Sequence, residues 1–244
     1  MATGIEGLDP LMEGGFPRGY TYTVVGSPGS GKTIFGFHFL VNGAEKFGEN
    51  GIYLTFEESS KSLRANSARF GMPVERLEKE GKLAIIDASP IRMEIGKYTM
   101  KTSSSLGVPE FSIDTVLSEL HAVRRKINAS RVVVDSITSL MMQYQDHFVI
   151  RKETLALIKS LSEVGGATSI LLSEAASEEE MGSGMKVETF LVSGVIFLHN
   201  IERAEERVRA IEIAKMRGTD HSRRLHPFRI TSTGIKVFPE ERVY

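Results

Sequence analysis

The sequence contains no cysteine, no long apolar run and almost no net charge. Without cysteine the chain forms neither a disulfide framework nor a cysteine-based metal site, and we expect a reducing, cytoplasmic setting. The longest apolar run, residues 190–198, is far shorter than the roughly 20 residues of a membrane-spanning helix, and the N-terminus has no signal-peptide pattern. A formal net charge of −1 predicts no general attraction to nucleic acid or acidic lipid.

The order of apolar segments indicates an α/β fold. The length of 244 residues allows one large domain with a well-buried core, and we assign residues 1–244 to it. Continuous apolar strands alternate with helices, which predicts a mostly parallel twisted sheet with helices on both faces. We expect these strands at 20–25, 51–56, 83–87, 131–136 and 168–173, with helices after Thr33 and at 60–70, 113–127 and 149–164.

The last third of the chain is rich in strands, which predicts antiparallel additions at one edge of the sheet. We expect strands at 190–199 and 207–214 and near residues 228 and 237. Two polar segments, 91–112 and 174–188, are expected to be mobile surface loops.

A glycine-rich run directly after the first strand predicts a binding site for a nucleoside triphosphate. It matches G-x-x-x-x-G-K-[ST] at every fixed position and consists of Gly26, Ser27, Pro28, Gly29, Ser30, Gly31, Lys32 and Thr33. The glycines let successive backbone N–H groups point at phosphate oxygens, while the lysine places its charge on the β- and γ-phosphates. The Thr33 hydroxyl suits Mg²⁺, and the dipole of the following helix also favours phosphate.

Two acidic positions extend this site. Asp135 ends an apolar strand and would hold Mg²⁺ beside Thr33; the alternative is a cap on the following turn. Glu57 and Glu58 follow the strand at 51–56, at the edge of the sheet where ligands bind in parallel folds. One of these carboxylates could orient the water that attacks the γ-phosphate, or both could stabilise the start of the next helix.

A basic turn after a late strand supplies two further cations. Lys215 and Arg217 alternate along an extended segment that Gly218 ends. They could clamp a γ-phosphate as an arginine finger does, or they could form an exposed basic turn.

Together these motifs resemble those of the KaiC-like ATPases of the RecA/RadA superfamily. The resemblance covers residues 3–238, and its specific parts are the paired glutamates and the K-x-R-G turn. It implies a RecA-like P-loop core that binds ATP or ADP with Mg²⁺ between the subunits of a ring, usually a hexamer. It also implies that Glu57 activates water with Glu58 as its partner, that Lys215 and Arg217 reach the neighbouring subunit's γ-phosphate, and that Thr219 and His221 lie near that nucleotide.

The sequence departs from the circadian members of this family in two ways. They carry two such domains, whereas this chain carries one phosphate-binding motif. Family members often carry an acidic residue in the segment before the late strand, and residues 190–194 contain none. The Ser-Thr pair that the circadian members phosphorylate is also absent, with only Thr189 nearby, so the resemblance leaves autokinase activity unassigned.

The charge pattern argues against nucleic acid as a partner. Recombinases of the superfamily hold DNA with loops that correspond to 141–148 and 174–188. The first segment has no Lys or Arg to contact phosphate. The second has five Glu against one Lys, so we expect it to repel a phosphate backbone. A basic cluster of Arg223, Arg224, His226 and Arg229 could still contact nucleic acid on an outer face.

The leading hypothesis is therefore a ring-forming, Mg²⁺-dependent ATPase with a regulatory or signalling role. A second is an ATP-binding scaffold with negligible turnover that reports its nucleotide state to an unidentified protein partner. A third is a recombinase-like protein that acts on DNA.

Overall fold

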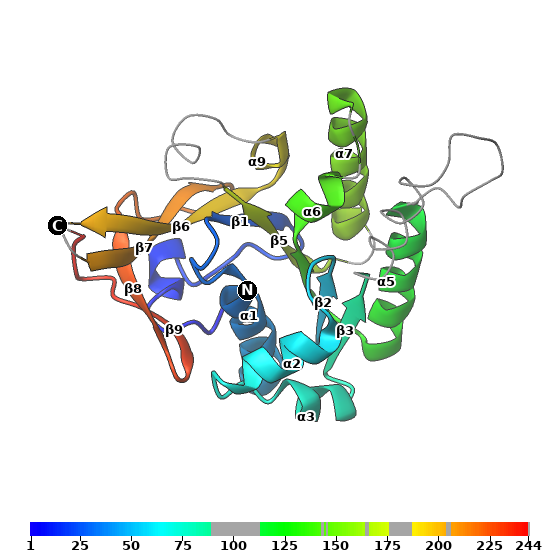
Figure 1. The fold of residues 1–244 in the computed structure, drawn as a ribbon, viewed down its shortest axis with the longest axis horizontal. Helices are drawn as coiled ribbons and strands as arrows, with labels where there is room; N and C mark the ends of the chain where they lie inside the picture. The colour runs from blue at the N-terminus through cyan, green and yellow to red at the C-terminus, as the bar shows by residue number, and fades with distance from the viewer. Residues whose placement is uncertain are drawn as a thin grey trace.

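A single twisted sheet runs through the described part of the protein (Figure 1). The structure is a computed structural model that describes residues 1–88, 113–142, 144, 146–163, 166–175, 187–203 and 206–243. Within these residues the sheet has the strand order β3-β2-β4-β5-β1-β6-β7-β8-β9. The strands are β1 (Thr21–Gly26), β2 (Gly51–Thr55), β3 (Leu83–Asp87), β4 (Arg131–Asp135), β5 (Thr168–Glu174), β6 (Gly194–Arg203), β7 (Glu206–Met216), β8 (His226–Thr231) and β9 (Gly234–Val237).

The pairing of these strands follows the predicted division of the chain. Strands β1 to β6 pair in parallel, and β7, β8 and β9 add antiparallel strands at one edge. A parallel sheet brings the carboxyl ends of its strands to one edge, which is where ligands bind in such folds. In this chain that edge carries Gly26, Thr55, Asp135 and Glu174.

Helices cover both faces of the sheet (Figure 1). The first face packs on α1 (Lys32–Lys46), α2 (Ser60–Ala68), α3 (Val74–Lys79) and the short 3₁₀ helix η1 (Asp9–Met12). The opposite face packs on α5 (Ile113–Ile127), α6 (Ile137–Met141) and α7 (His147–Glu163). A further short helix, α9 (Val187–Leu191), comes just before β6.

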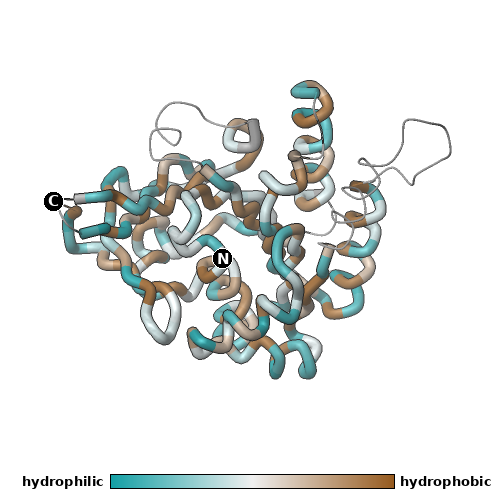
Figure 2. The backbone as a smooth tube through the Cα atoms, viewed as in Figure 1, coloured by the Kyte–Doolittle hydropathy of each residue, from teal (hydrophilic) through white to brown (hydrophobic). Residues whose placement is uncertain are grey.

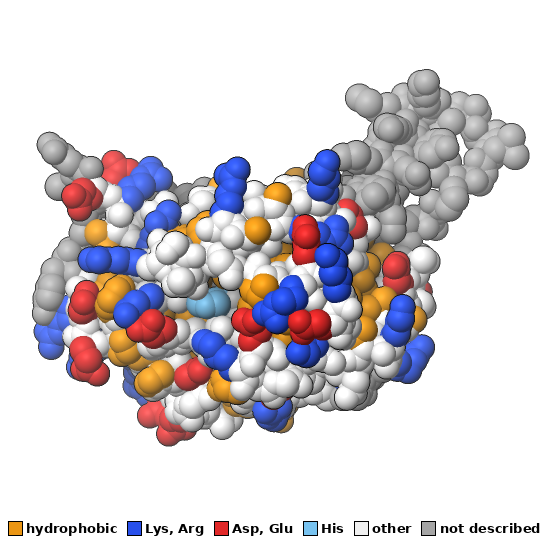
Figure 3. All heavy atoms as spheres, turned by 90° about the horizontal axis from the view of Figure 1, so that it is seen from below, with side chains coloured by type: hydrophobic (Ala, Val, Ile, Leu, Met, Phe, Trp, Pro, Cys, Tyr) orange, Lys and Arg blue, Asp and Glu red, His pale blue; other side chains and the backbone are white. Residues whose placement is uncertain are grey.

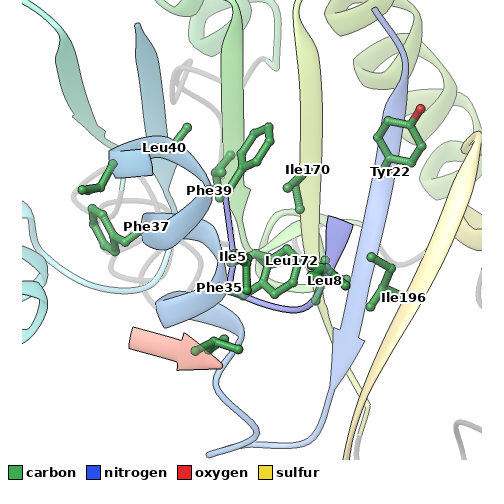
Figure 4. Close-up of a cluster of buried hydrophobic side chains, with 14 of the residues drawn as sticks. Ile5, Leu8, Tyr22, Phe35, Phe37, Phe39, Leu40, Ile170, Leu172 and Ile196 are labelled. Atoms are coloured by element: carbon green, nitrogen blue, oxygen red, sulfur yellow. The ribbon is translucent and has the colours of Figure 1, made fainter. Parts of the chain in front are cut away.

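Helix α1 forms the centre of the first core. Figure 4 shows its phenylalanines lying against the central strands. Phe37 stacks on Tyr53 of β2 with ring centroids 4.1 Å apart. A Cβ at Gly36 would lie 2.9 Å from Val133, so the glycine lets the helix approach the sheet closely. This contact fixes the position of the first turn of α1, where the phosphate-binding motif ends.

A buried arginine ties the N-terminal segment to this core. Arg131 at the start of β4 is 0% exposed and donates hydrogen bonds to the Glu49 carboxylate and to the carbonyls of Phe39 and Ala2. Its guanidinium also lies over the Phe39 and Phe47 rings. Buried charge is tolerated when it is paired and hydrogen-bonded, as here.

The hydropathy pattern is that of a packed α/β core, and the surface is polar with charges of both signs. In Figure 2 the most hydrophobic backbone lies in the central strands and the inner sides of the helices. On the face drawn in Figure 3, positive and negative side chains are interspersed. In the part of the chain that the structure describes, no helix combines the length and the apolar character that crossing a membrane requires.

The fold class predicted from the sequence is confirmed, and the local predictions are correct for most elements. The strand predicted at 190–199 is wrong in its first part, because residues 187–191 form α9 and β6 begins at Gly194. A short apolar run has no periodicity that separates strand from helix. Helices α3 and α6 were not predicted. The loop predicted at 91–112 lies outside the described residues, as does most of the one predicted at 174–188, whose first residue ends β5.

Candidate nucleotide-binding site

The glycine-rich motif forms the loop between β1 and α1, as its sequence predicts. Gly29 and Gly31 have φ angles of +78° and +102°, which favour glycine. A side chain at Gly31 would also meet Ile230 of β8. The Lys32 ammonium donates to the carbonyls of Gly26 and Ser27 at 2.9 and 3.1 Å, so it lies inside the loop. The loop and the N-terminus of α1 together form an anion-binding turn.

Asp135 lies directly opposite Thr33. The Thr33 hydroxyl donates to Asp135 Oδ2 at 3.1 Å, and the buried Tyr53 hydroxyl donates to the same oxygen. Burial raises the pKa of Asp135 to about 6, and the nearby Glu57 adds to the rise, against the two hydrogen bonds that lower it. The N-cap of the following helix is Ser136, so the alternative role of Asp135 as a cap is not used.

This oxygen-donor set fits a magnesium ion. Mg²⁺ prefers oxygen ligands, and it is commonly held by one or two protein groups while water and phosphate complete the shell. The Thr33 hydroxyl and the Asp135 carboxylate supply two such groups, and they are hydrogen-bonded to each other. Among the described residues no cluster of three or more His, Cys, Asp or Glu could bind a metal by side chains alone.

Glu57 faces the same loop from the end of β2. Its Oε1 accepts hydrogen bonds from the hydroxyls of Ser136 and of Ser139, the latter at 2.7 Å. Both serines lie at the start of α6, so this short helix fixes one oxygen of the carboxylate. Within the described residues, Oε2 accepts no hydrogen bond. A fixed carboxylate with one free oxygen can orient a water molecule.

Glu58 is placed differently from its neighbour. Its Oε2 accepts hydrogen bonds from Ser62 at 2.7 Å and from Asn66 at 3.2 Å, so it braces the first turns of α2. Glu58 does not line the pocket described below. Of the two roles weighed for this pair in the sequence, helix stabilisation matches the contacts of Glu58, and water orientation stays a prediction for Glu57, which lines the pocket.

These residues line one pocket of about 610 Å³, which is large enough for a nucleotide. Its polar wall comprises Lys32, Thr33, Glu57 and Asp135. Outside the phosphate loop and the first turn of α1, four lining residues were missed in the sequence: Phe70, Glu174, Arg209 and Ile230. Glu174 ends the strand beside β1, and the rule for carboxyl ends of parallel strands could have identified it. The other three come from segments whose position around the sheet cannot be predicted from the local sequence.

Lys215 and Arg217 lie near the amino ends of the parallel strands, whereas the pocket of their own chain lies at the carboxyl ends. Lys215 pairs with Val195 near the start of β6, whereas Gly26 pairs with Leu198 further along that strand. The Lys215 ammonium donates to the carbonyls of Thr189, Phe190 and Val192 at 3.1, 3.4 and 2.7 Å, around the end of α9. Burial, followed by the charge of Arg217, lowers the pKa of Lys215. The Arg217 side chain is exposed and makes no hydrogen bond with a described residue.

The turn after Arg217 is anchored to the N-terminal segment. The Thr219 hydroxyl and the backbone N–H of Asp220 donate to Glu13 Oε2 at 2.6 and 3.0 Å. The ring of His221 bonds the Ser222 carbonyl at 3.0 Å. Neither Thr219 nor His221 lines the pocket of its own chain. These bonds present the turn at the surface in a fixed conformation.

Of the four residues considered for DNA contact, Arg223, Arg224 and Arg229 are exposed, as the sequence suggested, whereas His226 is not. His226 is buried and bonds Ser222, and burial lowers its pKa, so it does not belong to an outer basic cluster as the sequence suggested. Arg229 lies over the Phe238 ring. Most of the segment 174–188, and residues 143 and 145 of the other one, lie outside the described residues.

Comparison with known proteins identifies the family. A family model described as ATPase, KaiC matches residues 1–242. The chain belongs to the KaiC family of ATPases. It is 36% identical over 239 residues to the circadian clock oscillator protein KaiC of Parasynechococcus marenigrum, and 37% identical over 237 residues to that of a Nostoc species.

The extent of these matches differs between curated and solved relatives. The matches cover 98% and 97% of this chain but 44% of each KaiC protein, so the chain spans about half the length of these relatives. The crystal structure of a KaiC-like protein of the archaeon Pyrococcus horikoshii OT3 matches with a TM-score of 0.82 and 38% identity, and covers 98% of both chains. Membership of this family supports nucleotide binding, and the match to the KaiC-like structure confirms the RecA-like fold.

Proposed function

We propose that this protein hydrolyses ATP at the interfaces between subunits of a homo-oligomeric ring, with six subunits as the expected number. The observation that carries the proposal is the convergence of Lys32, Thr33, Glu57 and Asp135 on one pocket. Lys32 and Thr33 open α1 after the phosphate loop, Glu57 follows β2 and Asp135 ends β4. Each has the chemistry that one part of phosphoryl transfer needs.

The phosphate-binding part of the mechanism belongs to the loop and α1. The backbone N–H groups of residues 27–33 would bind the phosphate oxygens, except at Pro28, which has no N–H. The Lys32 ammonium would move from the loop carbonyls to the β- and γ-phosphates. Thr33 and Asp135 would hold Mg²⁺, Asp135 largely through water. When bound, this ion neutralises charge that develops on the phosphate oxygens.

Glu57 would orient the attacking water. Ser136 and Ser139 fix one carboxylate oxygen, which leaves the other to accept a hydrogen bond from water in line with the γ-phosphate. Glu58 would act as a positioning residue through Ser62 and Asn66.

The neighbouring subunit would complete the site. Arg217, with its exposed guanidinium, is the first candidate for the contact in trans. Lys215 would join it by exchanging α9 carbonyls for a phosphate oxygen. Thr219 and His221 would lie close to the same nucleotide. Their position near the amino ends of the parallel strands, away from the pocket of their own chain, supports a contact with the nucleotide of another copy.

The biological output would be regulatory, with hydrolysis driving or timing a conformational change that a protein partner detects. The cytoplasmic setting stays a prediction from the sequence. ATP turnover measured across size-exclusion fractions, with Mg²⁺ and nucleotide present, tests the proposal. Activity confined to a ring-sized fraction is expected, and Lys32→Ala should abolish it. A ring that binds ATP without turnover would favour the regulatory scaffold, and an equally active monomer would contradict the shared site.

A further inference from the structure

We propose that Glu13 is a positioning residue for ATP turnover, which holds the turn at residues 217–221 in the conformation that reaches the nucleotide of the neighbouring subunit. The inference rests on the shared site proposed above. Glu13 follows the short helix η1 as its C-cap and does not line the pocket of its own chain. It would therefore act on the site of another copy, through the turn that it holds.

The backbone of Glu13 adopts a conformation that a glutamate side chain disfavours. Its φ angle is +50°, in the left-handed region, where a Cβ lies too close to the following carbonyl. Among the described residues, the other non-glycine residue with positive φ is Asn128, and asparagine is common in this conformation. Glycine would fit the position of Glu13 without strain. A strained residue that persists in this way points to a role for its side chain.

The carboxylate of Glu13 binds the turn directly. Its Oε2 accepts hydrogen bonds from the Thr219 hydroxyl at 2.6 Å and from the Asp220 N–H at 3.0 Å. These two bonds lower the pKa of Glu13, so the carboxylate stays charged near neutral pH. A charged acceptor makes a stronger hydrogen bond than a neutral one. One side chain thus fixes both a side chain and the backbone of the turn.

Backbone bonds fix the two ends of the same segment. The Arg217 N–H donates to the Ser193 carbonyl at 2.8 Å, and the Ser222 N–H donates to a carbonyl of η1 at 2.9 Å. The contacts of Glu13 lie between these ends, next to Gly218, whose φ is +85°. Because glycine is conformationally permissive, we expect the middle of the segment to sample other conformations when the carboxylate is removed.

This segment carries the groups assigned to the contact in trans. The exposed guanidinium of Arg217 directly precedes Gly218, and the family resemblance implies that Thr219 and His221 lie near the neighbouring nucleotide. A cation stabilises charge on the transferring phosphate only when its position is set beforehand, and a misplacement of about 1 Å can lower the rate about 10²-fold. Glu13 would therefore affect turnover through Arg217, and not nucleotide binding by the phosphate loop.

Replacement by glycine separates this role from a structural one. Glu13→Gly removes the carboxylate and also the backbone strain, so the melting temperature should stay within about 2 °C of wild type. ATP turnover in ring fractions should fall by about 10- to 100-fold, whereas ATP affinity should stay within about threefold of wild type. Glu13→Gln keeps an acceptor oxygen and should retain most of the turnover. Asn128→Gly, at the same φ of +50°, is the matched control and should hydrolyse ATP as wild type does.

Mixed rings test whether Glu13 acts in trans. Glu13→Gly keeps Lys32 and disturbs the donated turn, so rings mixed with Lys32→Ala should recover turnover. Rings mixed from Glu13→Gly and Arg217→Ala should not recover it, because both chains then lack a competent donated turn. A role in the general stability of the fold would not produce this difference between the two mixtures.

Wild-type turnover by folded Glu13→Gly would overturn the proposal, and so would recovery in rings mixed with Arg217→Ala. A Glu13→Gly protein that melts well below wild type and binds ATP weakly would show a structural role and overturn it as well. Failure of the Lys32→Ala and Arg217→Ala mixture to recover turnover would instead contradict the shared site, and the role of Glu13 would fall with it.

Discussion

Arg209 and Lys215 lie on the same strand, β7, but near its opposite ends. Arg209 pairs with Asn200, beyond the phosphate loop, whereas Lys215 pairs with Val195, near the start of β6. Six residues of extended chain separate them, which corresponds to about 20 Å. One subunit cannot bring both cations to one nucleotide without breaking the strand, so a shared site needs a second copy of the chain.

Replacing Glu57 should separate binding from turnover. We expect Glu57→Gln to lower ATP turnover by about 10²- to 10⁴-fold, the usual contribution of a positioned acid or base. ATP affinity should stay close to wild type, because the amide still accepts hydrogen bonds from Ser136 and Ser139. Steady-state turnover and equilibrium binding measured on one preparation check this.

Glu58→Gln is the matched control for that prediction. Glu58 bonds Ser62 and Asn66 and lies outside the pocket lining, so its loss should change turnover by less than about tenfold. Equal losses in the two variants would contradict the separate roles of the two glutamates.

The buried ion pair of Arg131 and Glu49 should govern the stability of the N-terminal segment. Glu49→Ala would leave the buried guanidinium with carbonyl acceptors only, and we expect a loss of about 3 kcal/mol in the free energy of unfolding. Gly43→Ala should also destabilise, because a Cβ there would collide with the Arg131 side chain. Chemical denaturation of each variant measures both effects.

Arg76→Ala provides the comparison for an exposed pair. Arg76 is 54% exposed and contacts Glu45 and Glu80, so its loss should cost less than about 1 kcal/mol. A Glu49→Ala cost that is no larger than the Arg76→Ala cost would show that Arg131 does not depend on its partner.

Stability should fall in acid because of His38. The Nδ1 of His38 accepts a hydrogen bond from the Ile235 N–H, and burial, with a smaller contribution from Lys46, lowers the pKa of His38 to about 4. The unfolded chain takes up a proton near pH 6.5, which the folded chain resists until about pH 4. The free energy of unfolding should therefore drop by up to about 3 kcal/mol as pH falls across that window.

His38→Gln isolates this contribution. Asp135, whose pKa burial raises to about 6, acts in the opposite sense, because its protonation favours the folded state as pH falls. That effect is present in both proteins and cancels in their difference. Urea unfolding at several pH values should show a smaller acid loss for His38→Gln than for wild type, and parallel curves would contradict the role of His38.

Much of the site could be predicted from the sequence because its parts are local. The phosphate loop and Glu57 follow buried apolar strands and Asp135 ends one, and the carboxyl ends of parallel strands meet at one edge. The start of β6 could not be predicted, because residues 190–199 form one apolar run in which α9 and the strand look alike.

Arg209 shows where sequence reasoning ends. Lys215 and Arg217 stand in a recognisable turn, whereas Arg209 is one of several charged residues along β7. Its place in the pocket depends on the order β1-β6-β7 and on the register between those strands, and both are set by packing between distant segments. The separate placement of Glu58 likewise depends on α2, which its own position in the sequence does not reveal.

A mixing experiment tests the central claim, that each nucleotide site is shared between two subunits. Arg217→Ala keeps the phosphate loop and Lys32→Ala keeps the cation donated in trans, so each protein alone should have little ATP turnover. Mixed rings, verified by native mass spectrometry, should recover a measurable part of wild-type turnover, because some interfaces combine an intact Lys32 with an intact Arg217. Mixed rings that stay inactive, or full activity of Arg217→Ala alone, would contradict the shared site.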